Sequence, residues 1–239
     1  MRIRYTLKVL TLSGITILML FVVVLTLRHT PVPILSNLPI PILQKILVPV
    51  KKNLLVPFTS QAPDNNWAEP WQNACEETVI VMVDNFYRGT SLTKEIAIAE
   101  ISKILSSKEQ SFGQSKNESL ETMLAMINAG QLNWQARVVT NPTLKALQGE
   151  IVKDRPVIVP VDARLLTNPY YANITPEYHV IVVSGYDSTE KKFIVQDPGT
   201  DKGANFTYGY DELMNAMHDY VTPDISQGRK AAIFTTPTK

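Results

Sequence analysis

The sequence has only one cysteine among its 239 residues, Cys75, so no intramolecular disulfide can form. The stability of the folded chain must therefore come from packing. A lone cysteine is most often a small buried hydrophobic residue, and an unpaired thiol is also open to oxidation. Cys75 is accordingly either a core residue or a thiol placed to react, and its surroundings must decide between these interpretations.

The sequence also has few histidines, a small net charge and neither of two common hydrolase motifs. The three histidines, His29, His179 and His218, show no H-E-x-x-H spacing, so we expect no catalytic metal and no cofactor. His218 is interpreted as a residue on a helix face or at a helix end. The formal net charge of +1, without a basic stripe, argues against nucleic acid as a partner. No G-x-S-x-G motif indicates a serine hydrolase.

An uncharged apolar stretch at 9–27 is the first long feature of the chain. Because about 20 apolar residues cross the hydrocarbon core of a bilayer as a helix, we predict a transmembrane segment there. The basic segment 1–8 stays preferentially on the cytoplasmic side, which predicts an extracytoplasmic location for the following residues. The stretch lacks a small-x-small cleavage pattern, so it is interpreted as an uncleaved signal anchor of a single-pass protein of the cell membrane.

The remaining sequence is predicted to form a linker and one domain. Residues 28–53 contain five prolines and no hydrophobic period, which predicts an extended, semi-rigid spacer. Residues 54–239 contain no internal repeat and are numerous enough for one domain with a hydrophobic core. The sequence does not indicate an oligomeric state.

Helical and strand-like patterns follow one another along this domain. They predict helices at 91–107, 117–130 and 141–154, and strands at 134–140, 155–163, 179–186 and 191–199. Asn141 is the expected N-cap of the third helix, with Pro142 at its first position. The apolar run 76–87 fits a strand by its β-branched residues and a buried helix by its length. Because helices come first and strands later, the predicted class is α+β.

A predicted hairpin, formed by the last two strands, carries His179 at its start and Asp197 at its end. With an even register the two side chains lie on one face as opposed or diagonal neighbours. A carboxylate next to an imidazole orients the ring and stabilises its protonated form, as a base that activates a Ser or Cys nucleophile requires. Considered one at a time, His179 has the alternative interpretation of a solvated histidine at a strand start, and Asp197 that of a residue in an ordinary Asp-Pro-Gly turn. Their presence in one hairpin favours a catalytic pair.

Cys75 provides the matching nucleophile if a helix begins at Glu76. The thiol then lies at the positive end of the helix, where the dipole and free backbone N–H groups favour a thiolate and a developing oxyanion. Glu76 and Glu77 start a helix well but place negative charge next to the thiolate. The imidazolium of His179 must therefore outweigh them.

Four stretches occur in order at 54–199: "VPFTSQ" followed by "ACEE", "SLETMLAMINAG", "LKALQGEIVKDRPVIVPV" and "HVIVVSGYDSTEKKFIVQDPG". They resemble the papain-like cysteine peptidases related to the bacteriocin-leader-processing type. Many members of that family have Cys-Gly where this chain has Cys75-Glu76, and a Cys-Glu-Glu form also belongs to it. No transporter or nucleotide-binding region is attached, so leader cleavage coupled to export is not implied.

The resemblance implies a papain-like fold in which a buried helix that starts at the cysteine packs on an antiparallel sheet. It implies Cys75 as the nucleophile, His179 as general base and then acid, and Asp197 as the residue that orients His179. It also implies a glutamine donor at the oxyanion hole, beside the backbone N–H of Cys75. Gln61 matches the motif best, and Gln72 is the alternative.

We therefore predict a membrane-anchored extracytoplasmic cysteine peptidase or amidase that cleaves a peptide or amide bond through a thioester on Cys75. The expected substrate is of peptide or peptidoglycan type, and the sequence does not identify it further. Two alternatives remain open. One is an inactive peptide- or cell-wall-binding domain on the same fold, and the other is an envelope acyl transferase that uses the same thiol.

Overall fold

The structure, a computed structural model, describes residues 48–114, 116–130, 132–171 and 176–238. The predicted transmembrane segment at 9–27, the basic segment before it and most of the linker lie outside the described residues. Within the described ranges, no helix is long and apolar enough to cross a bilayer. The compact unit Pro49–Lys239 contains all the elements described below.

Helices and strands are mixed along this unit. The helices are α4 (Cys75–Arg88), α5 (Lys94–Phe112), α6 (Leu120–Ala129), α7 (Leu144–Val152) and α8 (Tyr210–Ala216), with short 3-10 turns η1 (Trp71–Asn73), η2 (Ala163–Leu165) and η3 (Ile225–Gln227). The strands are β1 (Lys51–Asn53), β2 (Trp134–Thr140), β3 (Val157–Asp162), β4 (Tyr178–Asp187), β5 (Lys192–Gln196), β6 (Phe206–Gly209) and β7 (Ala231–Pro237). The predicted α+β class is confirmed.

The strands form one seven-stranded sheet in the order β2-β7-β3-β4-β5-β6, with β1 paired to β4. All pairings are antiparallel. The central strands β3 and β4 are buried along almost their whole length, which explains why their sequences are continuous apolar runs rather than alternating ones. The last strand of the chain, β7, lies between β2 and β3, so these two strands are neighbours in sequence order but not in the sheet.

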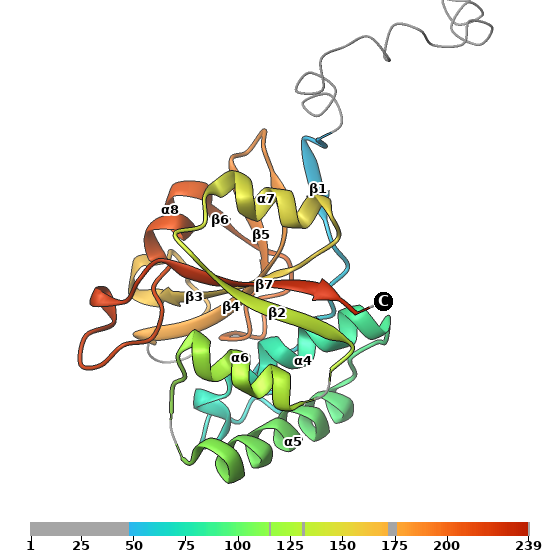
Figure 1. The fold of residues 1–239 in the computed structure, drawn as a ribbon, viewed down its shortest axis with the longest axis vertical. Coiled ribbons are helices and arrows are strands. Elements are labelled where there is room, and N and C mark those ends of the chain that lie inside the picture. The colour runs from blue at the N-terminus through green and yellow to red at the C-terminus, as the bar shows by residue number, and fades with distance from the viewer. Residues whose placement is uncertain (1–47, 115, 131, 172–175, 239) are drawn as a thin grey trace, which may run out of the picture. The chain divides into compact units, whose positions relative to one another are not determined.

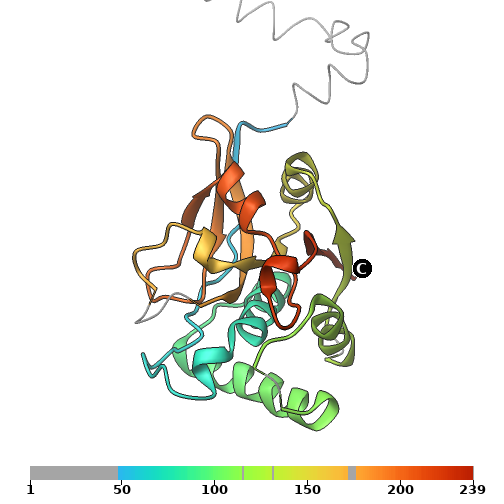
Figure 2. The same cartoon turned by 90° about the vertical axis from the view of Figure 1, so that its left-hand side faces the viewer.

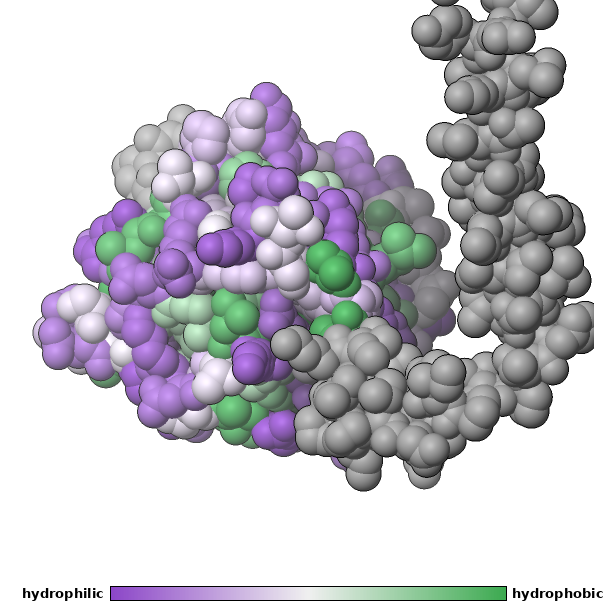
Figure 3. All heavy atoms as spheres, turned by 90° about the horizontal axis from the view of Figure 1, so that it is seen from above, coloured by the Kyte–Doolittle hydropathy of each residue, from purple (hydrophilic) through white to green (hydrophobic). Residues whose placement is uncertain are grey.

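Helices cover this sheet from two sides. In both views α4, α5 and α6 gather at one end of the domain, while α7 and α8 lie at the other (Figure 1, Figure 2). Figure 3, which shows the domain from above, has polar residues over most of that face, with small hydrophobic patches between them. Such a mixed surface is typical of a face in contact with water.

The ambiguous run 76–87 is a helix. Val79, Ile80 and Val83 of α4 are at most 1% exposed, so their burial in the core outweighs the strand preference of their β-branched side chains. The helix ends at Gly89, which has a φ of 65° and the left-handed conformation of a C-cap. Cys75 therefore starts a buried helix, as the resemblance implied.

The predicted helices at 91–107 and 117–130 are confirmed as α5 and α6. The third predicted helix starts later than expected, and the prediction of Asn141 as its N-cap and Pro142 as its first residue was wrong. The N-cap of α7 is Thr143, whose hydroxyl accepts a hydrogen bond from the backbone N–H of Ala146. Asn141 instead has a φ of 50° and donates its backbone N–H to Lys230, so it turns the chain beside β7.

The predicted hairpin is formed by β4 and β5. Val182 pairs with Gln196 and Val183 with Val195, and a bulge follows before Gly185. When this register is continued, His179 and Asp197 are diagonal neighbours on one face, as expected from their parity. Strands β1, β6 and β7 and helix α8 were not predicted from the sequence.

Candidate active site

A cleft of about 190 Å³ opens at the N-terminus of α4. Cys75, Gln61, Gln72 and His179 all line it, so segments far apart in the sequence meet here. Trp67 is also part of its wall. We call this space the Cys75 cleft. Asp197 is the one predicted site residue that does not line this cleft, and it contacts the imidazole of His179 from behind.

Cys75 is the first residue of α4, where the backbone N–H groups of the first turn have no partner inside the helix. Its side chain is 4% exposed, and Sγ donates a hydrogen bond to Oε2 of Glu76 at 3.0 Å. Burial raises the pKa of the Cys75 thiol well above its usual range, and the charge of Glu76 adds to this rise. An interaction with the backbone of Val180 opposes it. The sulfur thus lies beside the strand that carries His179.

The two glutamates after Cys75 do not act as two free charges. Burial, and then the charge of Glu77, raise the pKa of Glu76 to about 8, so its neutral form is favoured near pH 7. Burial also raises the pKa of Glu77, but the ammonium group of Lys108 lies 2.7 Å away and works against that rise. The expectation that Glu76 and Glu77 oppose formation of the thiolate agrees with the structure, because both charges raise the pKa of the Cys75 thiol. Burial of Glu76 and the ion pair of Glu77 with Lys108 reduce this opposition.

His179 and Asp197 form a buried pair, in which Nε2 lies 2.7 Å from Oδ1. Asp197 accepts four more hydrogen bonds, from the groups Gly199 N, Tyr208 Oη, Tyr171 Oη and Asn168 Nδ2. Burial raises the pKa of Asp197, but the charge of His179 and these hydrogen bonds bring it below the usual value. The carboxylate therefore stays ionised, and Nδ1 is the imidazole nitrogen that does not contact Asp197.

The donors that hold Asp197 were missed in the sequence. Asn168 and Tyr171 follow η2, and Tyr208 lies on β6, which was itself not predicted. Gly199, by contrast, was visible in the Asp-Pro-Gly motif. A Cβ atom there would lie 2.9 Å from Cε1 of Tyr171 and 3.0 Å from Nε2 of His179, so only glycine leaves room for the imidazole.

Gln61 lies in the Cys75 cleft and ties together the segments around the thiol. Its Nε2 atom donates to the carbonyl oxygens of Trp71 at 3.0 Å and Gln72 at 2.9 Å. Its backbone N–H donates to Pro198 at 3.0 Å, beside Asp197. Within the described part of the chain, Oε1 of Gln61 is buried without a hydrogen-bond partner. An oxyanion role requires the amide to leave the two carbonyls, and it stays a prediction.

The remaining candidates are Gln72, which lines the Cys75 cleft, and His218, which does not. Gln72 donates its side-chain amide to Glu69 at 2.7 Å on the exposed surface. His218 follows α8, where its Nδ1 atom lies 3.1 Å from the carbonyl oxygen of Ala216. Among the described residues, no group of three or more His, Cys, Asp and Glu side chains could hold a metal ion.

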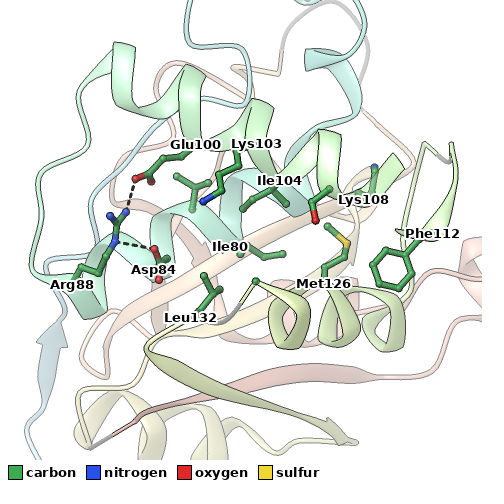
Figure 4. A pocket seen from close by; sticks show the side chains of 13 residues that line it. Ile80, Asp84, Arg88, Glu100, Lys103, Ile104, Lys108, Phe112, Met126 and Leu132 are labelled. Carbon is green, nitrogen blue, oxygen red and sulfur yellow. Dashed lines mark hydrogen bonds and ion pairs between the residues drawn. The ribbon is translucent and has the colours of Figure 1, made fainter. Parts of the chain in front are cut away.

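A second hollow of about 190 Å³, the helix pocket, lies between α4, α5 and α6 (Figure 4). Its wall is largely apolar, with Ile80 and Ile104 among its lining residues. At its rim Arg88 forms ion pairs with Asp84 at 2.8 Å and Glu100 at 2.6 Å. None of the predicted catalytic residues lines this pocket, so the candidate chemistry belongs to the Cys75 cleft.

A thiol at the start of a buried helix, in one cleft with an imidazole held by a carboxylate, is the arrangement expected of a cysteine peptidase site. The family model described as the Peptidase_C39 like family matches residues 53–222, and the chain belongs to this family. The resemblance found in the sequence is thereby confirmed.

Among 37 matching chains of solved structures is a Bacillus anthracis protein assigned as a C39-like peptidase. The match has a TM-score of 0.52 and 17% sequence identity, and it covers 79% of this chain and 99% of that chain. At this level of identity the likeness shows the fold alone. No relative was found among curated proteins.

Proposed function

We propose that this chain is a cysteine peptidase or amidase that acts outside the cytoplasm while anchored in the membrane. One observation carries the proposal: Cys75 and His179 line the same cleft, and His179 is fixed from behind by the buried carboxylate of Asp197. Membership of the Peptidase_C39 like family supports the same reaction class.

In the proposed reaction, Nδ1 of His179 takes the proton of the Cys75 thiol, and the thiolate attacks the carbonyl carbon of a peptide or amide. Backbone N–H groups at the start of α4 stabilise the oxyanion. His179 then returns the proton to the leaving amine as the C–N bond breaks, which leaves a thioester. A water molecule gives a proton to His179 and attacks the thioester, and the released sulfur regains that proton. Asp197 stays ionised throughout.

The membrane anchor rests on the uncharged stretch 9–27 and the proline-rich sequence that follows it; the predicted linker 28–53 is too long at its end, because Lys51–Asn53 form strand β1 of the domain. A C-terminal fusion to a reporter enzyme that is active only outside the cytoplasm tests it. Activity of the reporter in intact cells, and its loss when 9–27 is deleted, are the expected results. An inactive reporter in the full-length fusion contradicts the anchor without affecting the proposed chemistry.

A thiol-reactive activity probe tests the chemistry on the full chain in detergent. Wild type should label quickly at neutral pH, Cys75→Ala should not label, and His179→Ala should label at least about a hundredfold more slowly. His218→Ala is the matched control, because this histidine lies outside the Cys75 cleft, and it should label as wild type does. Equal labelling rates for His179→Ala and wild type would show that His179 does not act as the base.

An inactive binding domain is the second candidate. It is favoured by the low exposure of Cys75 and by the hydrogen bond that the thiol donates to Oε2 of Glu76, which keeps the proton on sulfur. The same probe separates the two functions, because a shielded thiol in its protonated form labels slowly in wild type and equally slowly in His179→Ala.

A further inference from the structure

The carboxyl group of Glu76 touches the reacting sulfur but has no part in the mechanism above. It is completely buried, and its Oε2 atom lies 3.0 Å from Sγ of Cys75. Its other oxygen, Oε1, accepts the backbone N–H of Glu118 at 2.8 Å. Each oxygen therefore has its own contact: Oε2 with the sulfur of Cys75, and Oε1 with the backbone of Glu118.

Several charged or titratable side chains surround this carboxyl group. They come from α4, α5, the segment before α6 and β4, and are Cys75, Glu77, Lys108, Glu118 and Tyr178. The ammonium group of Lys108 lies 2.7 Å from Glu77 and 3.7 Å from Glu118. Because this cation is shared with two other glutamates, a further buried negative charge on Glu76 is poorly compensated.

The contact between Sγ and Oε2 requires one hydrogen between the two atoms. If Glu76 is ionised, the thiol must supply this hydrogen, and Cys75 is held as an unreactive thiol. If Glu76 is protonated, its O–H can donate to a thiolate. Only the second arrangement is compatible with attack by sulfur.

We infer that the Glu76 carboxyl keeps a proton at neutral pH and donates it in a hydrogen bond to the Cys75 sulfur once His179 has taken the thiol proton. This inference rests on the proposed function of Cys75 as a nucleophile. The proton balance is simple, since the thiol proton moves to Nδ1 of His179 and the Glu76 proton stays on Oε2. Loss of the Glu76 proton switches the sulfur back to the thiol form.

The consequence is an inverted pH dependence. An ordinary thiol becomes more reactive as the pH rises, because the thiolate is the nucleophile. Here reactivity falls as Glu76 ionises, and the pKa of about 8 caused by burial and by Glu77 sets the position of that fall. Substitution of Glu76 by glutamine keeps a hydrogen-bond donor next to the sulfur and removes the titrating proton.

The test is the rate of alkylation by iodoacetamide between pH 6 and pH 10, measured on the full chain in detergent. In wild type the rate should drop about tenfold from pH 7 to pH 9, as expected for one proton with a midpoint near 8. Glu76→Gln should show no such drop. Glu109→Gln, which removes an exposed charge on α5, is the control and should follow wild type. A wild-type rate that keeps rising, or the same drop in Glu76→Gln, overturns the inference.

Alkylation needs no substrate, so the two proposals fail separately. If the protein shows the expected alkylation profile but hydrolyses no peptide or amide bond, the role of Glu76 is supported and the peptidase proposal is contradicted. Hydrolysis that depends on Cys75, together with an alkylation profile unchanged in Glu76→Gln, supports the peptidase proposal and contradicts the role of Glu76.

If Glu76→Gln does not fold, carbon-13 NMR of the glutamate carboxyl groups replaces the alkylation experiment on this variant. One glutamate should titrate near pH 8 in wild type and shift in Cys75→Ala, and the absence of any glutamate titrating above pH 6.5 overturns the inference.

Discussion

The Nε2 atom of His179 lies 2.7 Å from Oδ1 of Asp197, and the two side chains are 2% and 0% exposed. One backbone N–H and three side chains donate four further hydrogen bonds to the same carboxylate. Such a set of donors stabilises a buried charge that would otherwise be costly. The imidazole is therefore held by a group that cannot easily move or become protonated.

Asp197→Asn should lower the rate of labelling by the activity probe by roughly a hundredfold to ten-thousandfold. An amide cannot stabilise the imidazolium and favours the wrong tautomer of His179. Tyr208→Phe removes only one donor, at 2.6 Å, and should cost about tenfold or less. Labelling rates at pH 7 check both variants, and a wild-type rate for Asp197→Asn would contradict the pair.

Gly199→Ala should reduce labelling at least about tenfold, because the new methyl group would lie 3.0 Å from Nε2 of His179 and displace the ring. Gly149→Ala is its control, since nothing lies within 4 Å of a Cβ atom at that position in α7. This control should label as wild type does and gain about 0.5 to 1 kcal/mol in the free energy of unfolding. Equal labelling of the two variants would show that the imidazole tolerates the added carbon.

Lys108→Met should lower the free energy of unfolding by about 3 to 5 kcal/mol, because it leaves Glu77 without its cation in the interior. The double variant Lys108→Met with Glu77→Gln should recover part of this loss. Lys94→Met breaks an exposed ion pair with Asp64 and should leave the stability unchanged. Urea unfolding compares the four proteins. A small effect of Lys108→Met would indicate that Glu77 is neutral when buried.

The local part of this structure could be predicted from the sequence. Strand β2 (Trp134–Thr140) has the predicted bounds, and the hairpin of β4 and β5 follows from two β-rich runs with a polar turn between them. His179 and Asp197 meet because the register of one hairpin sets their positions, so only local information was needed. The helix start at Cys75 was implied by the resemblance to the family, because the residue pattern of 76–87 left strand and helix open.

Long-range contacts account for what could not be predicted. The helical state of 76–87 depends on burial against strands that come much later in the chain. Lys108 reaches Glu77 from another helix, and Tyr208 reaches Asp197 from β6, and no spacing in the sequence indicates either contact. The protonation of Glu76 likewise depends on burial, which a sequence does not reveal.

Gln61→Ala should lower the free energy of unfolding by about 1 to 3 kcal/mol, because its buried side chain donates to the carbonyl groups of Trp71 and Gln72, just before Cys75. Gln72→Ala breaks only a surface contact with Glu69 and should change stability by less than about 0.5 kcal/mol. Thermal unfolding ranks the two variants. A larger loss of stability for Gln72→Ala would mean that the surface contact of Gln72 with Glu69, rather than Gln61, holds η1 in place.

The free energy of unfolding should fall as the pH rises from about 4.5 to 8, because of Glu76. Below this window the carboxyl group is protonated in both the folded and the unfolded chain. Within it the unfolded chain releases the proton while the folded chain retains it, so each step in pH favours unfolding. The full interval amounts to a loss on the order of 4 kcal/mol.

Glu76→Gln isolates this effect, since the amide does not titrate and all other groups are common to both proteins. Urea unfolding of wild type and Glu76→Gln at pH 5 and pH 8 gives the difference directly. Wild type should lose more stability than the variant between the two pH values. If the two proteins change in parallel, Glu76 has the same affinity for its proton in the folded and the unfolded chain, and the hydrogen bond to Cys75 then holds the proton on sulfur.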